Sequence, residues 1–93
     1  MSRRSRLEMY YDILMVIEKG VEEPTRIMYK TNLSWEVLQD LFDTLIEGGF
    51  IKEEVKINSG KNIYRVTEKG RNSLSYYLKS LDGLVEVNQI ISR

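Results

Sequence analysis

The chain has 93 residues, which is enough for one folded domain and leaves no room for a separate catalytic domain. It contains neither cysteine nor histidine, which excludes a disulfide framework, thiolate zinc sites and the commonest acid–base side chain. Its 14 Lys and Arg residues balance 14 Asp and Glu residues, so a uniformly basic surface is absent and any site for a polyanion must be local.

No segment resembles a signal or membrane-spanning sequence. The N-terminus begins with basic residues, but Glu8 and Asp12 interrupt the apolar residues after them, so the apolar core of a signal peptide is missing. No window reaches the roughly 18 uninterrupted apolar residues of a membrane span. We therefore expect an intracellular, cytoplasmic protein without a membrane partner.

The first predicted helix runs from Leu7 to Lys19 and ends at Gly20. Ser5 is suited to cap it, with Glu8 three residues on to complete a capping box. Apolar residues at spacings of three and four predict its buried face, which consists of Leu7, Tyr10, Tyr11, Leu14, Ile17 and, on the flank, Ile13.

A second, short helix is predicted from Thr25 to Lys30, introduced by Pro24. Thr31-Asn32-Leu33 then forms a tight turn, since asparagine tolerates the left-handed conformation that such corners need. Ser34 caps a third helix, which ends at Gly48-Gly49. This third helix has an apolar stripe of Leu38, Leu41, Phe42 and Leu45 opposite a polar stripe of Glu36, Gln39, Asp40, Asp43 and Glu47.

Two strands are predicted next, at Phe50–Ile57 and Asn62–Val66, joined as a hairpin by the polar turn Asn58–Lys61. Thr67 caps a final helix, which can kink or end at Asp82-Gly83. Its apolar residues keep a spacing near three and a half, and they are Leu74, Tyr77, Leu78, Leu81, Leu84, Val85 and Ile91.

This order of helix, helix, turn, helix, hairpin and helix predicts an α+β fold of the winged helix-turn-helix type. In such a fold the second helix supports the third, whose start can enter the DNA major groove, about 12 Å wide, while the hairpin tip reaches the neighbouring backbone. We expect a winged helix-turn-helix domain at residues 1–70 and a C-terminal dimerisation element at residues 71–93.

Four stretches resemble the small archaeal winged-helix DNA-binding proteins of about ten kilodaltons: Ser5–Glu8, Thr25–Tyr29, Asn32–Ser34 and Tyr64–Gly70. The sequences Thr-Arg-Ile-Met-Tyr and Asn-Leu-Ser are the most specific parts. The resemblance implies DNA binding, dimerisation through a long C-terminal helix paired antiparallel with its partner, and a role in chromatin or transcription.

The candidate DNA contacts fall into two sets. Contacts to the phosphate backbone are predicted for Arg26, Lys30, Thr31, Asn32, Lys61, Asn62 and Arg65. Contacts to bases are predicted for Ser34, Trp35, Glu36 and Gln39. Gln39 can pair with adenine and Glu36 can accept from cytosine, whereas the spacing of Trp35 favours partial core packing over base contact.

Other charged residues have alternative interpretations. Solvated surface charge is the alternative role of the backbone-contacting cations, and Arg3, Arg4 and Arg6 form either a basic arm or, as we favour, a frayed end. The acidic face of the third helix is more typical of solvated surface than of a metal or acid–base site. We expect no cofactor, no metal and no enzymatic activity, since no phosphate-cradling glycine loop or nucleophile elbow is present.

The last helix is expected to pair with a second copy of the chain, because the first helix and the hairpin already provide a core. The predicted dimer interface consists of Leu74, Tyr77, Leu78, Leu81 and Val85. The alternative is that this stripe covers the first helix.

The sequence predicts a sequence-selective protein that binds double-stranded DNA as a homodimer and regulates transcription. Two alternatives stay open. One is a winged-helix module for protein–protein interaction, favoured by the zero net charge and the acidic face of the third helix. The other is a chromatin-associated architectural DNA-binding protein.

Overall fold

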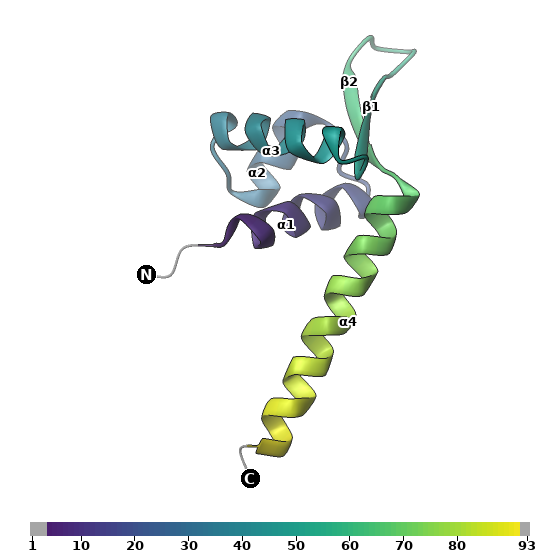
Figure 1. The fold of residues 1–93 in the computed structure, drawn as a ribbon. Coiled ribbons are helices and arrows are strands. Elements are labelled where there is room, and N and C mark those ends of the chain that lie inside the picture. Colours follow the sequence, from purple (N-terminus) through teal and green to yellow (C-terminus); the bar gives the residue numbers. More distant parts are fainter. Residues whose placement is uncertain (1–3, 92–93) are drawn as a thin grey trace.

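The computed structural model describes residues 4–91, with side chains up to residue 81. These residues form α1 (Arg6–Glu18), α2 (Pro24–Thr31), α3 (Trp35–Glu47), β1 (Ile51–Val55), β2 (Asn62–Val66) and α4 (Glu68–Ile91). Figure 1 shows α1, α2 and α3 gathered together, with the hairpin rising on one side and α4 extending away on the other. The predicted α+β fold and its order of elements are confirmed.

Local sequence signals set where the helices start. The side chains of Ser5, Ser34 and Thr67 each accept a hydrogen bond from the backbone N–H three residues on, at 3.0, 3.3 and 3.1 Å. Each therefore satisfies one of the N–H groups that a helix start leaves without an intrahelical partner. These three caps were all predicted, and they fix the starts of α1, α3 and α4.

Asn32 forms the corner between α2 and α3. Its φ of 56° lies in the left-handed region, and it is the only non-glycine residue with positive φ in the described part of the chain. Asparagine occupies this region at low cost, so the predicted turn is confirmed. The corner sets the direction in which α3 leaves α2.

The core lies between α1, α3, the hairpin and the start of α4. The apolar stripe predicted for α3 is confirmed, and the ring of Phe42 stacks on that of Tyr64 in β2 with centroids 4.2 Å apart. The burial predicted for Leu14 and Ile17 is confirmed, and Ile13, placed on the flank, is fully buried, whereas Leu7 is exposed. This shift arises because α1 packs against α2, β2 and α4 together, so its flank is covered as well as its predicted stripe.

The hairpin is antiparallel, with Ile51 opposite Val66. Its first strand is shorter than predicted, because Lys56 and Ile57 belong to the turn. There the Lys56 N–H donates to the Lys61 carbonyl and the Gly60 N–H donates to the Lys56 carbonyl, both at 2.8 Å.

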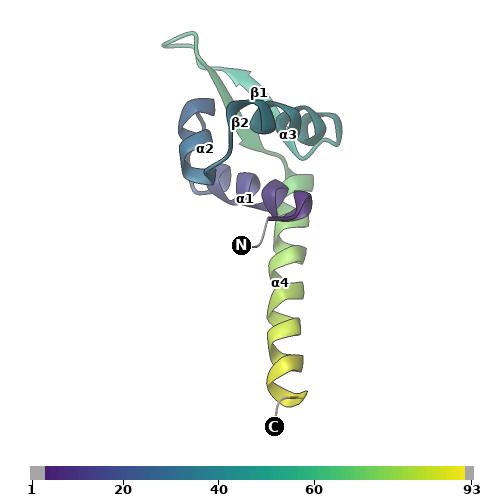
Figure 2. The same cartoon turned by 90° about the vertical axis from the view of Figure 1, so that its left-hand side faces the viewer.

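A single continuous helix forms α4, and it passes through Asp82-Gly83, where a kink or an end was expected. One glycine inside a helix costs only about 1 kcal/mol, which a helix of 24 residues can absorb. Figure 2 shows α4 running away from the core as a straight rod. The radius of gyration is 15.2 Å, against about 12 Å for a compact domain of this length. No helix in the described range is both long and apolar enough for a lipid bilayer.

Candidate nucleic-acid interface

Two cations lie free on the surface of α2. Arg26 and Lys30 are exposed, lie one helical turn apart, and take part in none of the ion pairs formed by the described residues. The guanidinium groups of Arg4, Arg6 and Arg65 are in contrast all paired with carboxylates. The cations of α2 can therefore meet an anionic ligand without breaking an existing ion pair.

The hairpin brings further free charge beside α2. Lys61 is exposed, without an ion pair among the described residues. Together with Asn62 it lines a surface hollow of about 260 Å³, whose other wall includes Pro24 and Thr25 at the start of α2. The predicted backbone contacts of the hairpin thus lie beside the start of α2.

The start of α3 presents the predicted base contacts. The Ser34 hydroxyl oxygen accepts the capping hydrogen bond and retains its own proton for donation. Glu36 is exposed and Gln39 is half-buried. Trp35 is 47% exposed and lies outside the core cluster and outside the partly buried residues packed against it, which corrects the expected partial core packing. At 100° per residue Trp35 lies about 70° around the helix from the centre of the buried stripe, which places it at the margin of that stripe.

An acidic ridge runs along the outermost line of α3. It lies opposite the buried stripe, every member is exposed, and it consists of Glu36, Asp40, Asp43 and Glu47. Asp40 is partly neutralised, because its carboxylate lies 2.9 Å from the Arg6 guanidinium, and this contact raises the pKa of Arg6. No cluster of metal-ligating side chains occurs within the described residues.

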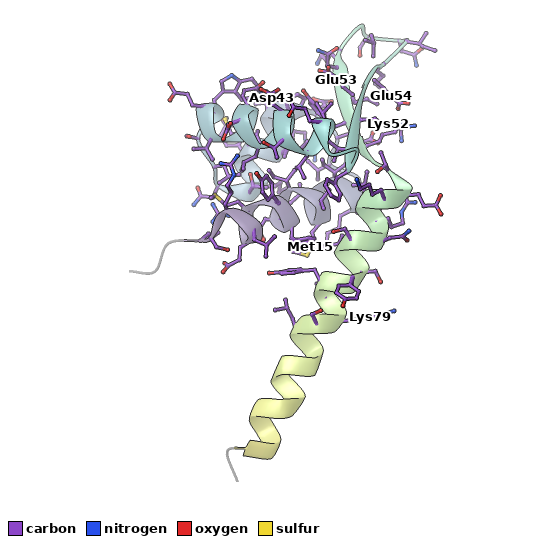
Figure 3. All side chains as sticks on the ribbon, in the orientation of Figure 1. Met15, Asp43, Lys52, Glu53, Glu54 and Lys79 are labelled. Atoms are coloured by element: carbon purple, nitrogen blue, oxygen red, sulfur yellow. The ribbon has the colours of Figure 1, made fainter. Side chains whose placement is uncertain are left out.

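The ridge continues toward the hairpin around Tyr64. Figure 3 shows Asp43 on α3 and Glu53 on β1 on the same side of the molecule. The Tyr64 hydroxyl donates to the Glu53 carboxylate at 3.0 Å. Burial, this hydrogen bond and the charges of Glu53 and Asp43 raise the pKa of Tyr64 to about 12. This side of the interface therefore repels phosphate.

Two predicted backbone contacts are engaged elsewhere. Thr31 is only 3% exposed, and its hydroxyl donates to the Ile27 carbonyl at 2.7 Å, so its side chain cannot reach a ligand. Arg65 projects from the body of β2, where its guanidinium contacts the carboxylates of Glu22 and Glu54 at 3.0 and 2.5 Å. The structure thus leaves Arg26, Lys30, Asn32, Lys61 and Asn62 as candidates for backbone contact.

Arg4 and Arg6 have a role that the sequence did not indicate. The Arg4 guanidinium donates to the Asp12 carboxylate and to the carbonyls of Thr31 and Asn32, at 3.0, 2.7 and 3.2 Å. Arg6 binds Asp40 on α3. These residues are therefore neither a frayed end nor a free arm, because they tie the start of α1 to the corner and to α3. Arg3 lies outside the described residues.

The residues predicted for a dimer interface divide into two groups. Leu74 is buried in the core of its own chain, and the ring of Tyr77 stacks on that of Tyr11 with centroids 4.0 Å apart. Leu78 and Leu81 come next on the same side of α4 and are both exposed. Val85 lies outside the residues whose side chains are described.

A family model described as winged helix-turn-helix matches residues 3–84, which include every element that forms this surface. The chain belongs to the winged helix-turn-helix family. An uncharacterised protein of Methanocaldococcus jannaschii is 37% identical to this winged helix protein over 73 residues, which make up 78% of this chain and 69% of that one. The resemblance to small archaeal winged-helix proteins is thereby confirmed.

Solved structures share the fold of this winged helix protein. The crystal structure of Sso10a-2, described as a DNA-binding protein from Sulfolobus solfataricus, has a TM-score of 0.69 and 26% identity and covers 96% of this chain and 94% of its own. ZitR of Lactococcus lactis, described as a zinc-responsive MarR family member, has a TM-score of 0.71 and 18% identity. The winged helix protein covers 62% of the ZitR chain, and that likeness concerns the fold alone.

Proposed function

We propose that this winged helix protein binds double-stranded DNA as a homodimer and regulates transcription. The observation that carries the proposal is the exposure of free cations on α2 and at the hairpin, whose base borders the start of α2. The similarity to Sso10a-2, a DNA-binding protein by its description, supports it. Residues 1–70 would act as the DNA-binding domain and residues 71–93 as the dimerisation element.

Phosphate binding falls to α2 and the hairpin. Arg26 and Lys30 would neutralise phosphates on one side of the major groove, and Lys61 would do so beyond it, with the polar side chains of Asn32 and Asn62 as hydrogen-bond donors. Because such contacts release counterions, binding would weaken steeply with salt.

The residues in the first turns of α3 would contact the edges of the bases. Ser34 and Gln39 offer hydrogen bonds to base edges, Trp35 offers an apolar surface for a thymine methyl group, and Glu36 can accept from cytosine. The acidic ridge repels phosphate farther along the helix, so α3 would approach the groove with its N-terminal end only. This geometry favours selective binding over dense coating of DNA.

A duplex-binding titration across salt concentrations tests the proposal. The plot of log affinity against log salt has a negative slope, and each lost phosphate contact reduces the magnitude of that slope by about 0.9. Arg26→Ala with Lys61→Ala should therefore reduce the magnitude by about two. Lys79→Ala is the matched control, since Lys79 projects from α4 away from α3 and the hairpin (Figure 3). A duplex affinity that does not change with salt concentration, or an unchanged slope in the double variant, would overturn the proposal.

A second candidate function is supported by the acidic ridge. Four exposed carboxylates in a line suit a basic protein surface better than a nucleic acid. Under this alternative no duplex is bound even at low salt, and a protein partner is captured through α3. Asp43→Asn with Glu47→Gln would weaken that capture, whereas the same variant should strengthen DNA binding or leave it unchanged.

A further inference from the structure

Ile57 is exposed to a degree that folding does not explain. It is 97% exposed, the highest value among the large apolar side chains of the described residues, and Val55 beside it is 63% exposed. Both side chains lie at the outer end of the hairpin. An apolar side chain in this position contributes no burial to the fold.

The turn holds Ile57 in a defined place. Lys56 and Lys61 pair at its base, since the Lys56 N–H donates to the Lys61 carbonyl, and the Lys56 carbonyl accepts from the N–H groups of Ser59 and Gly60. Gly60 supplies the left-handed conformation, with φ of 68°, that closes the turn. The apolar side chain is thus presented on a short, hydrogen-bonded tip.

The unpaired charges of the turn indicate the chemistry of the partner of Ile57, because the nearby carboxylates of Glu22 and Glu54 are paired with Arg65. Lys56 and Lys61 are exposed, and neither takes part in an ion pair within the described residues. Asn58 and Ser59, also exposed, add hydrogen-bond donors. An apolar side chain between two cations fits an anionic partner that offers an apolar slot, and the minor groove of DNA is one, because its stacked bases can be parted by a side-chain wedge.

The position of the tip favours DNA over an anionic lipid surface. The hairpin stands beyond α3, on the side of the molecule opposite the end of α4, as Figures 1 and 2 both show. The base of the same hairpin borders the start of α2 through the hollow at Lys61 and Asn62. A duplex bound to α2 and α3 would therefore lie within reach of the tip.

We propose that Ile57 inserts into the minor groove as a wedge and kinks the bound duplex. This inference rests on the proposed DNA binding and deepens it. Lys56 and Lys61 would bind the phosphates on the two sides of the groove, and Asn58 would donate to the acceptors that A·T pairs present there. The preferred site would then carry a flexible pyrimidine–purine step under the tip, because such steps kink most easily.

The test combines affinity and bending on one probe. The probe is a short duplex selected from a random pool by binding to the unmodified full chain, with donor and acceptor fluorophores at its two ends. Fluorescence anisotropy reports binding and energy transfer reports the bend. Three variants isolate the wedge: Ile57→Ser removes it, Ile57→Leu retains an apolar side chain, and Ile57→Lys replaces it with a further cation. All three change a side chain outside the core.

The wedge predicts a specific pattern. The unmodified chain and Ile57→Leu bend the duplex, whereas Ile57→Ser loses the bend and binds about three- to tenfold more weakly. Ile57→Lys loses the bend but retains affinity through its charge.

An equal bend in all four proteins, or no bend in any, would overturn the wedge while leaving DNA binding intact. If Ile57→Ser instead abolished binding to anionic phospholipid vesicles without altering the bend, a lipid surface would replace DNA as the partner. A chain that bound no duplex at all would refute the proposed function itself.

Discussion

The Arg4 side chain acts at the point where the two helices of the helix-turn-helix meet. Its guanidinium lies against the carbonyls of Thr31 and Asn32, at the C-terminal end of α2. Those carbonyls carry the negative end of the helix dipole, so a cation there is favourable. The Asp12 carboxylate at 3.0 Å holds the guanidinium in this position. One side chain from outside the motif therefore stabilises its corner.

Replacing Arg4 tests this role. Arg4→Ala should lower the free energy of unfolding by about 1 kcal/mol, because the contacts are charge-assisted but partly solvated. Urea denaturation gives the value. Arg26→Ala is the matched control, since Arg26 has no ion pair among the described residues, and its effect should stay within about 0.5 kcal/mol. Equal effects of the two substitutions would contradict the role of Arg4.

The pKa of Tyr64 leads to a prediction at alkaline pH. Burial and the contact with Glu53 raise the pKa from 10.0 to about 12, so the folded chain keeps the phenol proton at a pH where the unfolded chain releases it. The stability associated with this proton is present below pH 10.0 and declines as the pH rises toward about 12. Tyr64→Phe should flatten the alkaline decline, and the ultraviolet band of tyrosinate should show one late-titrating tyrosine that this variant lacks.

Residues with local roles were predictable, and those with distant partners were not. Ser34 and Asn32 act through backbone groups within a few positions, so residue type alone indicates their roles. Arg4 contacts residues 27 and 28 positions away, and no local pattern reports such a contact. Thr31 is similar, because its burial depends on the packing of α2 against the rest of the core.

At the level of elements, the joint between the hairpin and α4 depends on one glycine. Gly70 lies in the first turn of α4, and a Cβ added there would overlap the carbonyl oxygen of Phe50 and come within 2.9 Å of a Val66 methyl group. The Thr67 hydroxyl also donates to the Gly49 carbonyl at 2.6 Å. The start of α4 is therefore in direct backbone contact with the segment that leads from α3 into β1.

Gly70→Ala should disturb this joint although alanine favours helices. The overlap involves backbone atoms, which move only with the whole segment, so we expect a loss of about 3 kcal/mol and a fall in melting temperature of roughly 10–20 °C. Ser75→Ala, at an exposed position of the same helix, should be neutral or slightly stabilising. Thermal unfolding followed by circular dichroism compares the two, and similar melting temperatures would refute the close packing at Gly70.

Hydrophobic periodicity predicted the elements well, because α3 has one covered side and its stripe coincides with its buried residues. It predicted less for α1, which is covered from several directions. Local residue preference, in contrast, misjudged Asp82-Gly83, where the continuity of a long helix outweighs the preference of two residues.

At the scale of the whole molecule, the C-terminal part of α4 extends beyond the elements of its own chain that could cover it. After Tyr77 the helix leaves the core, and Leu78 and Leu81 remain exposed on the side that carries Leu74. The helix has 24 residues and is about 36 Å long, and the part from Leu78 onward makes up more than half of it. An unpartnered helix of this kind is only marginally stable in water, which favours a second copy as its partner.

Charge placed on this face should separate the proposed dimer. Leu78→Glu with Leu81→Glu should weaken self-association by at least about tenfold, because two carboxylates would be buried at the helix pair. Sedimentation velocity over a range of concentrations measures this effect. Ser75→Glu with Lys79→Glu, on the other side of α4, is the matched control and should sediment like the unmodified chain. Monomeric behaviour of the unmodified chain would contradict the dimer.

The stack of Tyr11 on Tyr77 also bears on the spacing of a DNA site. The two rings are nearly parallel, at 6°, and the hydroxyls of Tyr11 and Ser73 share a hydrogen bond of 2.8 Å. These contacts join α1 to α4, and the ion pair between Arg6 and Asp40 joins α1 to α3. In a two-fold dimer joined through α4, the separation of the two α3 helices would then be rigid. Binding by such a dimer would depend on the rotational position of the two half-sites around the DNA axis. Inserting half a turn of DNA, about five base pairs, would turn one half-site away from its α3 helix. Inserting a full turn would restore the orientation of that half-site but not its distance from the other.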